Sequence, residues 1–149
     1  MRIALFQPDI AGNVGTILRL AACFGVPVDV IEPCGFPFSE RSLKRAGMDY
    51  AAQTEISRHN DWTHFQAALP GRLILLSTRG DAVIADAGFA IGDTLLLGSE
   101  SAGAPGFVHD AADLVVRIPL RPGFRSLNVA VTAGIALHEA MRQTGTLPQ

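Results

Sequence analysis

Residues 118–141 read IPLRPGFRSLNVAVTAGIALHEAM, in which a loop rich in Pro, Gly and Arg leads into an apolar helical pattern. The helix is predicted over 128–143, with Asn128 as its N-cap and Gly145 as its stop signal. A loop that only joined two elements would need a few turn residues, whereas this one is longer and ends in Ser-Leu-Asn. The stretch therefore indicates a loop that holds a ligand at the start of a helix.

Upstream of this loop, apolar runs alternate with segments of helical periodicity. Buried parallel strands are predicted over 3–6, 28–31, 73–76, 94–97 and 114–118, and helices over 14–24, 40–46, 61–68 and 128–143. Asn13 and Asp61 occupy N-cap positions, and Gly25 and Gly47 end the first and second helices. The alternation predicts an α/β fold, a parallel sheet flanked by helices.

Loops that follow the carboxyl ends of parallel strands are where open α/β sheets bind ligands. Three such loops are predicted, after Leu76, Leu97 and Ile118. The second of them reads GSESAGAPG (98–106), whose small residues let the backbone turn sharply and approach a ligand closely. On pattern alone, a flavodoxin-like domain that binds a small molecule is the leading interpretation.

The chain has 149 residues, of which 48% are hydrophobic and 17% charged, and no apolar run reaches about 18 residues. One soluble domain, residues 1–149, is expected, with no membrane partner. Cys23 and Cys34 form no C-x-x-C pair, which favours a reducing cytoplasm over a disulfide framework or a zinc site. Because the formal charge is −2, a nucleic acid would need a local basic patch.

The Gly-rich turns lack three common motifs. AGNVGTILR (11–19) does not have the G-x-G-x-x-G spacing of a dinucleotide site, and GSESAGAP (98–105) has Ala104 where a P-loop has its lysine. The serines of the second turn do not fit the G-x-S-x-G register of a hydrolase. The four histidines show no ligand spacing, so no metal is expected.

Three segments, in this order, resemble the motifs of the SPOUT superfamily of RNA methyltransferases, in the branch that methylates ribose 2′-hydroxyls. They read NVGTILR (13–19), LLLGSESAGAP (95–105) and IPLRPGFRSLNVAVTAGIAL (118–137). The short length and the stretch IEPCGFPFSERSLKRAGMDY (31–50) are most similar to the members that act on the wobble nucleotide of tRNA, cytidine or uridine 34. The resemblance implies methyl transfer from S-adenosylmethionine to the ribose 2′-hydroxyl of that nucleotide.

The resemblance also implies a C-terminal deep trefoil knot, a feature nearly absent from other proteins. In this family the loops of the knot form the S-adenosylmethionine pocket, and two subunits pack through their knotted regions as a homodimer. Carried over to this chain, the cofactor site falls on Leu76, Gly98, Ile118, Ser126 and Leu127.

The family's polar motif positions fall on Asn13, Arg19, Glu100 and Asn128, with Ser126 shared with the cofactor site. The resemblance makes Arg19 the catalytic residue. Since a guanidinium stays charged in proteins, we expect Arg19 to hold a phosphate or stabilise the developing alkoxide, while the proton leaves by another route. Glu100 is expected to pair with Arg19 and fix its rotamer.

For tRNA, the candidate basic patch combines a helical stretch with the last loop. Its members besides Arg19 are Arg41, Lys44, Arg45, Arg121 and Arg125, which are suited to phosphate contacts. Two alternatives remain open: a 2′-O-methyltransferase that acts at another tRNA or ribosomal RNA position, and a catalytically idle RNA-binding module on the same fold.

Overall fold

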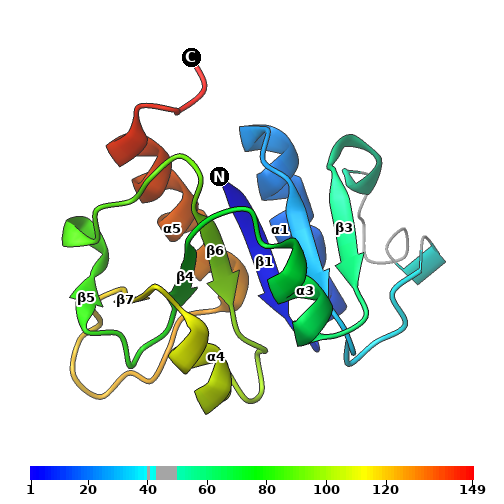
Figure 1. The fold of residues 1–149 in the computed structure, drawn as a ribbon, viewed down its shortest axis with the longest axis horizontal. Coiled ribbons are helices and arrows are strands. Elements are labelled where there is room, and N and C mark those ends of the chain that lie inside the picture. Colours follow the sequence, from blue (N-terminus) through cyan, green and yellow to red (C-terminus); the bar gives the residue numbers. More distant parts are fainter. Residues whose placement is uncertain (40, 43–49) are drawn as a thin grey trace.

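The structure is a computed structural model that describes residues 1–39, 41–42 and 50–149. Within this part of the chain, seven strands form one parallel sheet in the order β3-β2-β1-β6-β4-β7-β5 (Figure 1). The strands are β1 Arg2–Phe6, β2 Val28–Ile31, β3 Ile56–His59, β4 Leu73–Leu76, β5 Ala82–Val83, β6 Thr94–Leu97 and β7 Leu114–Arg117.

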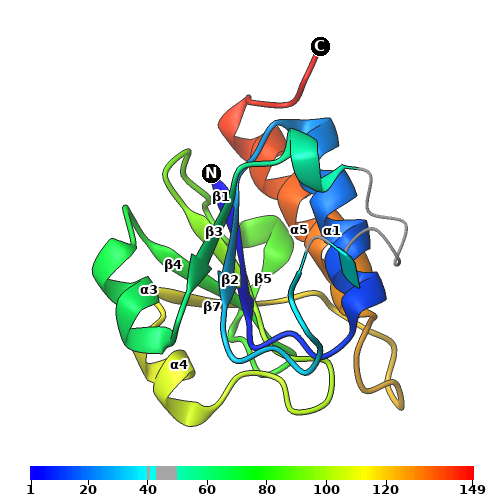
Figure 2. The ribbon, with the colours of Figure 1, turned by 90° about the vertical axis from the view of Figure 1, so that its right-hand side faces the viewer.

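Helices cover both faces of the sheet. They are α1 Ala11–Phe24, α3 Trp62–Ala68, α4 Gly106–Ala111 and α5 Val129–Thr144, with short 3-10 turns η1 Ala51–Gln53 and η2 Ile84–Asp86. Figures 1 and 2 together show α1 and α5 side by side on one face and α3 and α4 on the other. The described part of the chain contains no helix long and apolar enough to span a membrane.

Two apolar clusters hold these layers together, one on each face of the sheet. The first packs Leu18 of α1 and Leu137 of α5 against the sheet, and the second packs Phe65 of α3 and Val108 of α4 against it. Every residue of β2, β4 and β6 is buried, because the central strands of a parallel sheet are covered on both faces. Continuous apolar runs in the sequence reflect this burial.

The predicted parallel sheet flanked by helices is confirmed, and the five predicted strands agree with β1, β2, β4, β6 and β7 to within one residue at each end. Among the described residues, two strands and one helix were missed, along with the short 3-10 turns η1 and η2. Strand β3 (ISRH) is half-polar, β5 has only 2 residues, and α4 begins at Gly106 directly after Pro105, a pair that resembles a loop.

The helix caps agree with the predictions except at Asn13. Asp61 accepts a hydrogen bond from the His64 backbone N at 2.9 Å, and Gly25 and Gly145 adopt the left-handed conformation with φ of 67° and 68°. Helix α1 begins earlier than predicted, at Ala11, so Asn13 lies inside its first turn and does not cap it. Except for residues 41 and 42, the predicted helix 40–46 and its stop Gly47 lie outside the described residues.

Candidate functional site: a cavity at the carboxyl ends of three strands

Strands β4, β6 and β7 are neighbours, and their carboxyl ends meet at one edge of the sheet, the lower edge in Figure 1. The loops that leave these ends, 77–81, 98–105 and 118–128, come from distant parts of the sequence. They surround a cavity of about 220 Å³. All five residues expected to hold the cofactor line it: Leu76, Gly98, Ile118, Ser126 and Leu127.

The cavity combines apolar and hydroxyl side chains. Leu76, Ile118 and Leu127 contribute to an apolar surface, which suits an adenine ring. Sequence reasoning missed four hydroxyl residues of the lining, namely Ser77, Thr78, Ser99 and Thr132. Ser77 and Thr78 directly follow a buried strand, and a position at the carboxyl end of a parallel strand could have identified them as ligand-binding candidates.

A tight turn builds one wall of the cavity. Ser99 and Gly103 exchange two backbone hydrogen bonds, of 3.1 and 2.9 Å, and Gly103 has a φ of 68°. A Cβ added at Gly98 would lie 2.4 Å from the backbone carbon of Gly103, so only glycine fits there. The turn places Glu100 at the rim of the cavity.

A chain of hydrogen bonds joins three of the predicted polar residues at this rim. Asn128 Nδ2 donates to Asn13 Oδ1 at 3.0 Å, and Asn13 Nδ2 donates to Glu100 Oε1 at 3.0 Å. Asn128 Oδ1 faces the other way and accepts from the backbone N of Ala130 at 2.8 Å, which caps α5 as predicted. This series of hydrogen bonds therefore ties the first turns of α1 and α5 to the turn after β6.

Asp9 belongs to the same cluster and was missed by sequence reasoning. Its backbone N donates to Glu100 Oε2 at 2.9 Å, and its Oδ2 accepts from the Ser101 backbone N at 3.3 Å and from the Ser101 hydroxyl. Hydrogen bonding to the Glu100 side chain, and then to Ser101, lowers the pKa of the Asp9 carboxyl. No local pattern marks Asp9, because its partners lie more than 90 residues away, at separations of 91 and 92.

Arg19 does not join this cluster. It lies six residues beyond Asn13 on α1, about 9 Å along the helix axis, and is exposed. Its guanidinium carbon stacks over the Tyr50 ring, 5.1 Å from the centroid. The expected pair between Arg19 and Glu100 is not formed: the ion pairs of the described residues do not include Arg19, and Glu100 accepts from Asn13 and Asp9 instead.

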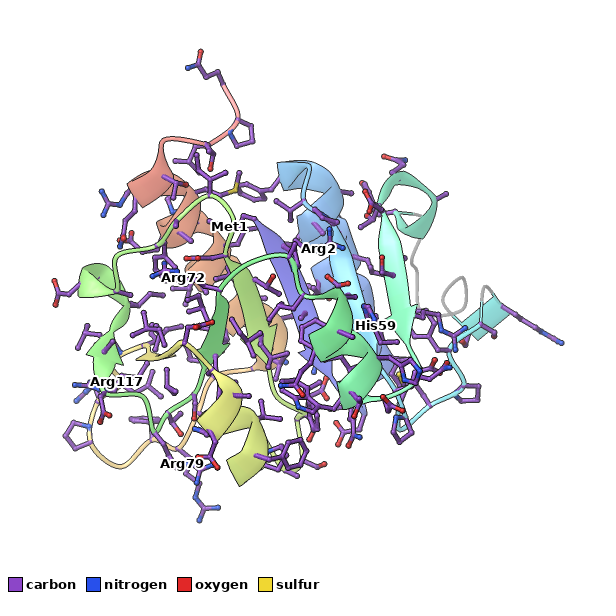
Figure 3. All side chains as sticks on the ribbon, in the orientation of Figure 1. Met1, Arg2, His59, Arg72, Arg79 and Arg117 are labelled. Atoms are coloured by element: carbon purple, nitrogen blue, oxygen red, sulfur yellow. The ribbon has the colours of Figure 1, made fainter. Side chains whose placement is uncertain are left out.

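Figure 3 shows labelled arginines at opposite edges of the sheet. Arg2 and Arg72 lie toward the upper edge, and Arg79 lies toward the lower edge. The first two are held in ion pairs, Arg2 with Asp29 and Arg72 with Asp93, each at 2.8 Å. We therefore exclude them as free phosphate ligands.

Arg79 lies beside the cavity. Its Nη2 donates to the carbonyl oxygen of Ala104, a cavity residue, at 3.3 Å and contacts His109 Nε2 at 2.9 Å. Because a guanidinium can only donate, Nε2 accepts and the ring is neutral in this contact. Burial, and then the charge of Arg79, lower the pKa of His109 in agreement with this form.

The candidate RNA ligands divide into three groups. Arg121 and Arg125 are exposed in the loop 118–128 that lines the cavity, and Arg41 is exposed in the segment 41–42. Lys44 and Arg45 lie outside the described residues. Across the described ranges, no three His, Cys, Asp or Glu side chains are grouped so that they could hold a metal ion.

A family model for the SpoU rRNA Methylase family matches residues 1–138. The chain belongs to this family. Among the relatives of this SpoU-family chain, the tRNA (cytidine(34)-2′-O)-methyltransferase of Beijerinckia indica subsp. indica is 53% identical over 148 residues, which cover 97% of this chain and 92% of that protein.

Solved structures agree with this SpoU assignment. A structure from work on the 2-OH methylation of C/U34 on tRNA has a TM-score of 0.90 and 41% identity, covering 95% of this chain and 94% of that one. An AdoMet-bound rRNA methyltransferase from Sinorhizobium meliloti has a TM-score of 0.82 and 30% identity, covering 95% of this chain and 55% of that one.

Proposed function

We propose that this chain transfers a methyl group from S-adenosylmethionine to the ribose 2′-hydroxyl of the wobble nucleotide of tRNA, cytidine or uridine 34. One observation carries the proposal: Glu100 lines the cavity and is also hydrogen-bonded to the series of polar residues at its rim. The relative that is 53% identical, and similar in length, acts at cytidine 34 according to its name, and this supports the choice of nucleotide.

The cavity fits the proposed cofactor. Leu76, Ile118 and Leu127 would contact the adenosine, and the Ser126 hydroxyl and the backbone of Gly98 would hydrogen-bond it. When bound, S-adenosylmethionine supplies an electrophilic sulfonium methyl group, and S-adenosylhomocysteine is the product. The ribose 2′-oxygen would take up that methyl group while the sulfur keeps the electron pair of the broken bond, and the hydroxyl proton would pass to solvent water.

Glu100 is a poor candidate for the acceptor of this proton. Both of its oxygens already accept hydrogen bonds within the protein, from Asn13 Nδ2 at 3.0 Å and from the Asp9 backbone N at 2.9 Å. We assign Glu100 the role of fixing the amide of Asn13, which in turn fixes Asn128. These residues would hold the ribose in line for attack, since positioning supplies much of the rate in such transfers.

Arg19 would stabilise the negative charge that develops on the 2′-oxygen or hold a neighbouring phosphate. For the described residues, the ion pairs found do not include Arg19, so no carboxylate among them neutralises its guanidinium. Arg121 and Arg125, with Arg41, Lys44 and Arg45, would contact phosphates of the tRNA.

We further propose a homodimer that packs through α1 and α5. Val131 and Ile135 are spaced by four residues on α5 and are 50% and 39% exposed, and Ile10, just before α1, is 49% exposed. Exposed apolar side chains at the start of α1 and in the first turns of α5 favour a covering partner, and a second copy would also present the basic patch twice.

The trefoil knot belongs to the same proposal, and the course of the C-terminal segments supports it. Strand β7 lies between β4 and β5, and a Cβ added at Gly80 would lie 2.7 Å from the backbone carbon of Val116, so the loop after β4 runs directly against β7. The chain then returns through 118–128 to α5.

We assign residues 1–149 to one domain and place the enzyme in the cytoplasm with its tRNA substrate.

The experiment that tests the proposal is transfer of labelled methyl from S-adenosylmethionine to bulk tRNA, with wild type and Arg19→Ala, followed by mapping of the modified nucleotide. Label at nucleotide 34 with wild type, and its loss in Arg19→Ala, is the expected result. Label at another tRNA position or in ribosomal RNA would overturn the assigned nucleotide. A wild type that binds the cofactor and labels no RNA would identify an idle module.

A further inference from the structure

The side chain of Arg19 is held by a single described contact. Its guanidinium carbon lies 5.1 Å from the centroid of the Tyr50 ring, within the range of a cation–π interaction. Tyr50 is the only tyrosine of the chain and is half-buried. A ring that is partly covered can hold one orientation against the flat guanidinium.

The backbone around Tyr50 is fastened to α1 beside Arg19. The Thr54 hydroxyl lies 3.1 Å from the carbonyl oxygen of Leu18 and also 3.1 Å from the carbonyl oxygen of Tyr50. Leu18 directly precedes Arg19, so one hydroxyl joins the turn that carries the ring to the helix that carries the guanidinium. The Thr54 hydroxyl therefore fixes the backbone of Tyr50 relative to the backbone next to Arg19.

The other arginine–aromatic stack in the described chain shows a different arrangement. Arg58 lies 4.9 Å from the centroid of the Phe38 ring and also forms an ion pair with Glu32 at 2.6 Å. That carboxylate occupies guanidinium donors of Arg58. A π face, in contrast, orients Arg19 without accepting its N–H groups or cancelling its charge.

We propose that Tyr50 is a positioning residue for methyl transfer, one that orients the Arg19 guanidinium through its ring and leaves the N–H donors for the ribose 2′-oxygen or a flanking phosphate of the RNA. This inference rests on the proposed function, because it takes Arg19 as the catalytic arginine. It assigns to the turn 50–54 a role in catalysis rather than in packing alone.

The test is a double-mutant cycle in methyl transfer to tRNA with Arg19→Ala, Tyr50→Leu and the double variant, together with Tyr50→Phe. Tyr50→Leu is expected to lower kcat about fivefold with little change in cofactor Kd, and Tyr50→Phe to restore it, because the phenyl face remains. In the Arg19→Ala background, Tyr50→Leu should change kcat by less than about twofold. Phe38→Leu, which removes the stack on Arg58, is the matched control and should leave kcat unchanged.

An equal loss from Tyr50→Leu with and without Arg19 would overturn the proposal, as would a Tyr50→Phe variant as slow as Tyr50→Leu. A wild type without methyl transfer would instead contradict the proposed function. Should Tyr50→Leu not fold, 3-fluorotyrosine gives a single ¹⁹F signal in this chain, since Tyr50 is its only tyrosine. Arg19→Ala should shift that signal, and an unchanged signal would overturn the stack in solution.

Discussion

Asn13 and Glu100, 87 residues apart in sequence, are joined by a 3.0 Å hydrogen bond from the amide of the first to the carboxylate of the second. The other carboxylate oxygen accepts from the Asp9 backbone N at 2.9 Å. Because both partners are donors, both oxygens of Glu100 are required to act as acceptors. This requirement determines which way the Asn13 amide faces and hence where its oxygen meets Asn128.

We expect Glu100→Gln to slow methyl transfer and to preserve cofactor binding. The new amide NH₂ would face a donor, either Asn13 Nδ2 or the Asp9 N–H, so one charge-assisted hydrogen bond is lost. A loss of about 2 kcal/mol in the transition state corresponds to roughly 30-fold in kcat. Single-turnover kinetics and calorimetric Kd for S-adenosylmethionine measure the two effects. Glu139→Gln, outside the cavity, is the control, and a Glu100→Gln variant that lost only cofactor binding would contradict this role.

Gly98→Ala should damage the cavity itself. The added methyl would lie 2.4 Å from the Gly103 backbone carbon and 2.6 Å from the Ala104 backbone N, atoms that cannot move without opening the turn. We expect cofactor affinity to fall at least about tenfold and the melting temperature to drop, in line with an overpacking cost of about 1–3 kcal/mol. Isothermal titration and thermal melts measure both. Gly106→Ala is the control, because no atom lies within 4 Å of its added Cβ; equal effects of the two substitutions would show that the close approach is unimportant.

The central strands could be predicted because burial on both faces forces continuous apolar runs, such as LILL in β4 and TLLL in β6. Strand β3, at the edge of the sheet, is only half-buried and keeps Arg58 and His59, so no apolar run marks it. Asn13 resembled an N-cap because a capping asparagine and an asparagine bonded to a distant carboxylate look identical in a sequence.

The five cavity residues were placed by resemblance to a family, and the strand ends alone would have identified only the loops. Side-chain pairings such as Asp9 with Ser101 depend on the order β1-β6-β4-β7, which brings distant loops to one edge. A single sequence does not show that order. For the same reason, the expected pair of Arg19 with Glu100 was wrong: the sequence placed both in motifs, and the geometry gave Glu100 other donors.

The carboxylate of Glu139 makes the free energy of unfolding depend on pH in the acidic range. Hydrogen bonds from Arg142, and then from Gln143, lower the pKa of Glu139 from 4.5 to about 2. A lowered pKa means that the stabilisation is complete above the unfolded value of 4.5 and is lost as the pH falls toward 2. The difference in unfolding free energy between wild type and Glu139→Gln, measured with urea, should therefore be constant above about pH 5 and shrink below pH 4.5. A difference that persists unchanged at lower pH would contradict this assignment.

Replacing Arg121 by Gln should weaken tRNA binding through a local loss of charge. Arg121 is exposed in the loop 118–128, beside Ile118 and Ser126 of the cavity, so we expect it to contact a phosphate near the target nucleotide. Loss of one phosphate contact should lower the slope of log affinity against log salt by about 0.7–0.9 and leave cofactor Kd within about twofold. Filter binding across a salt series measures the slope. Arg142→Gln removes the same charge at the far end of α5, so it separates a local contact from net charge. If both substitutions reduce the slope equally, the loop does not touch the RNA backbone, because a charge that acts only through the net field has no preferred position.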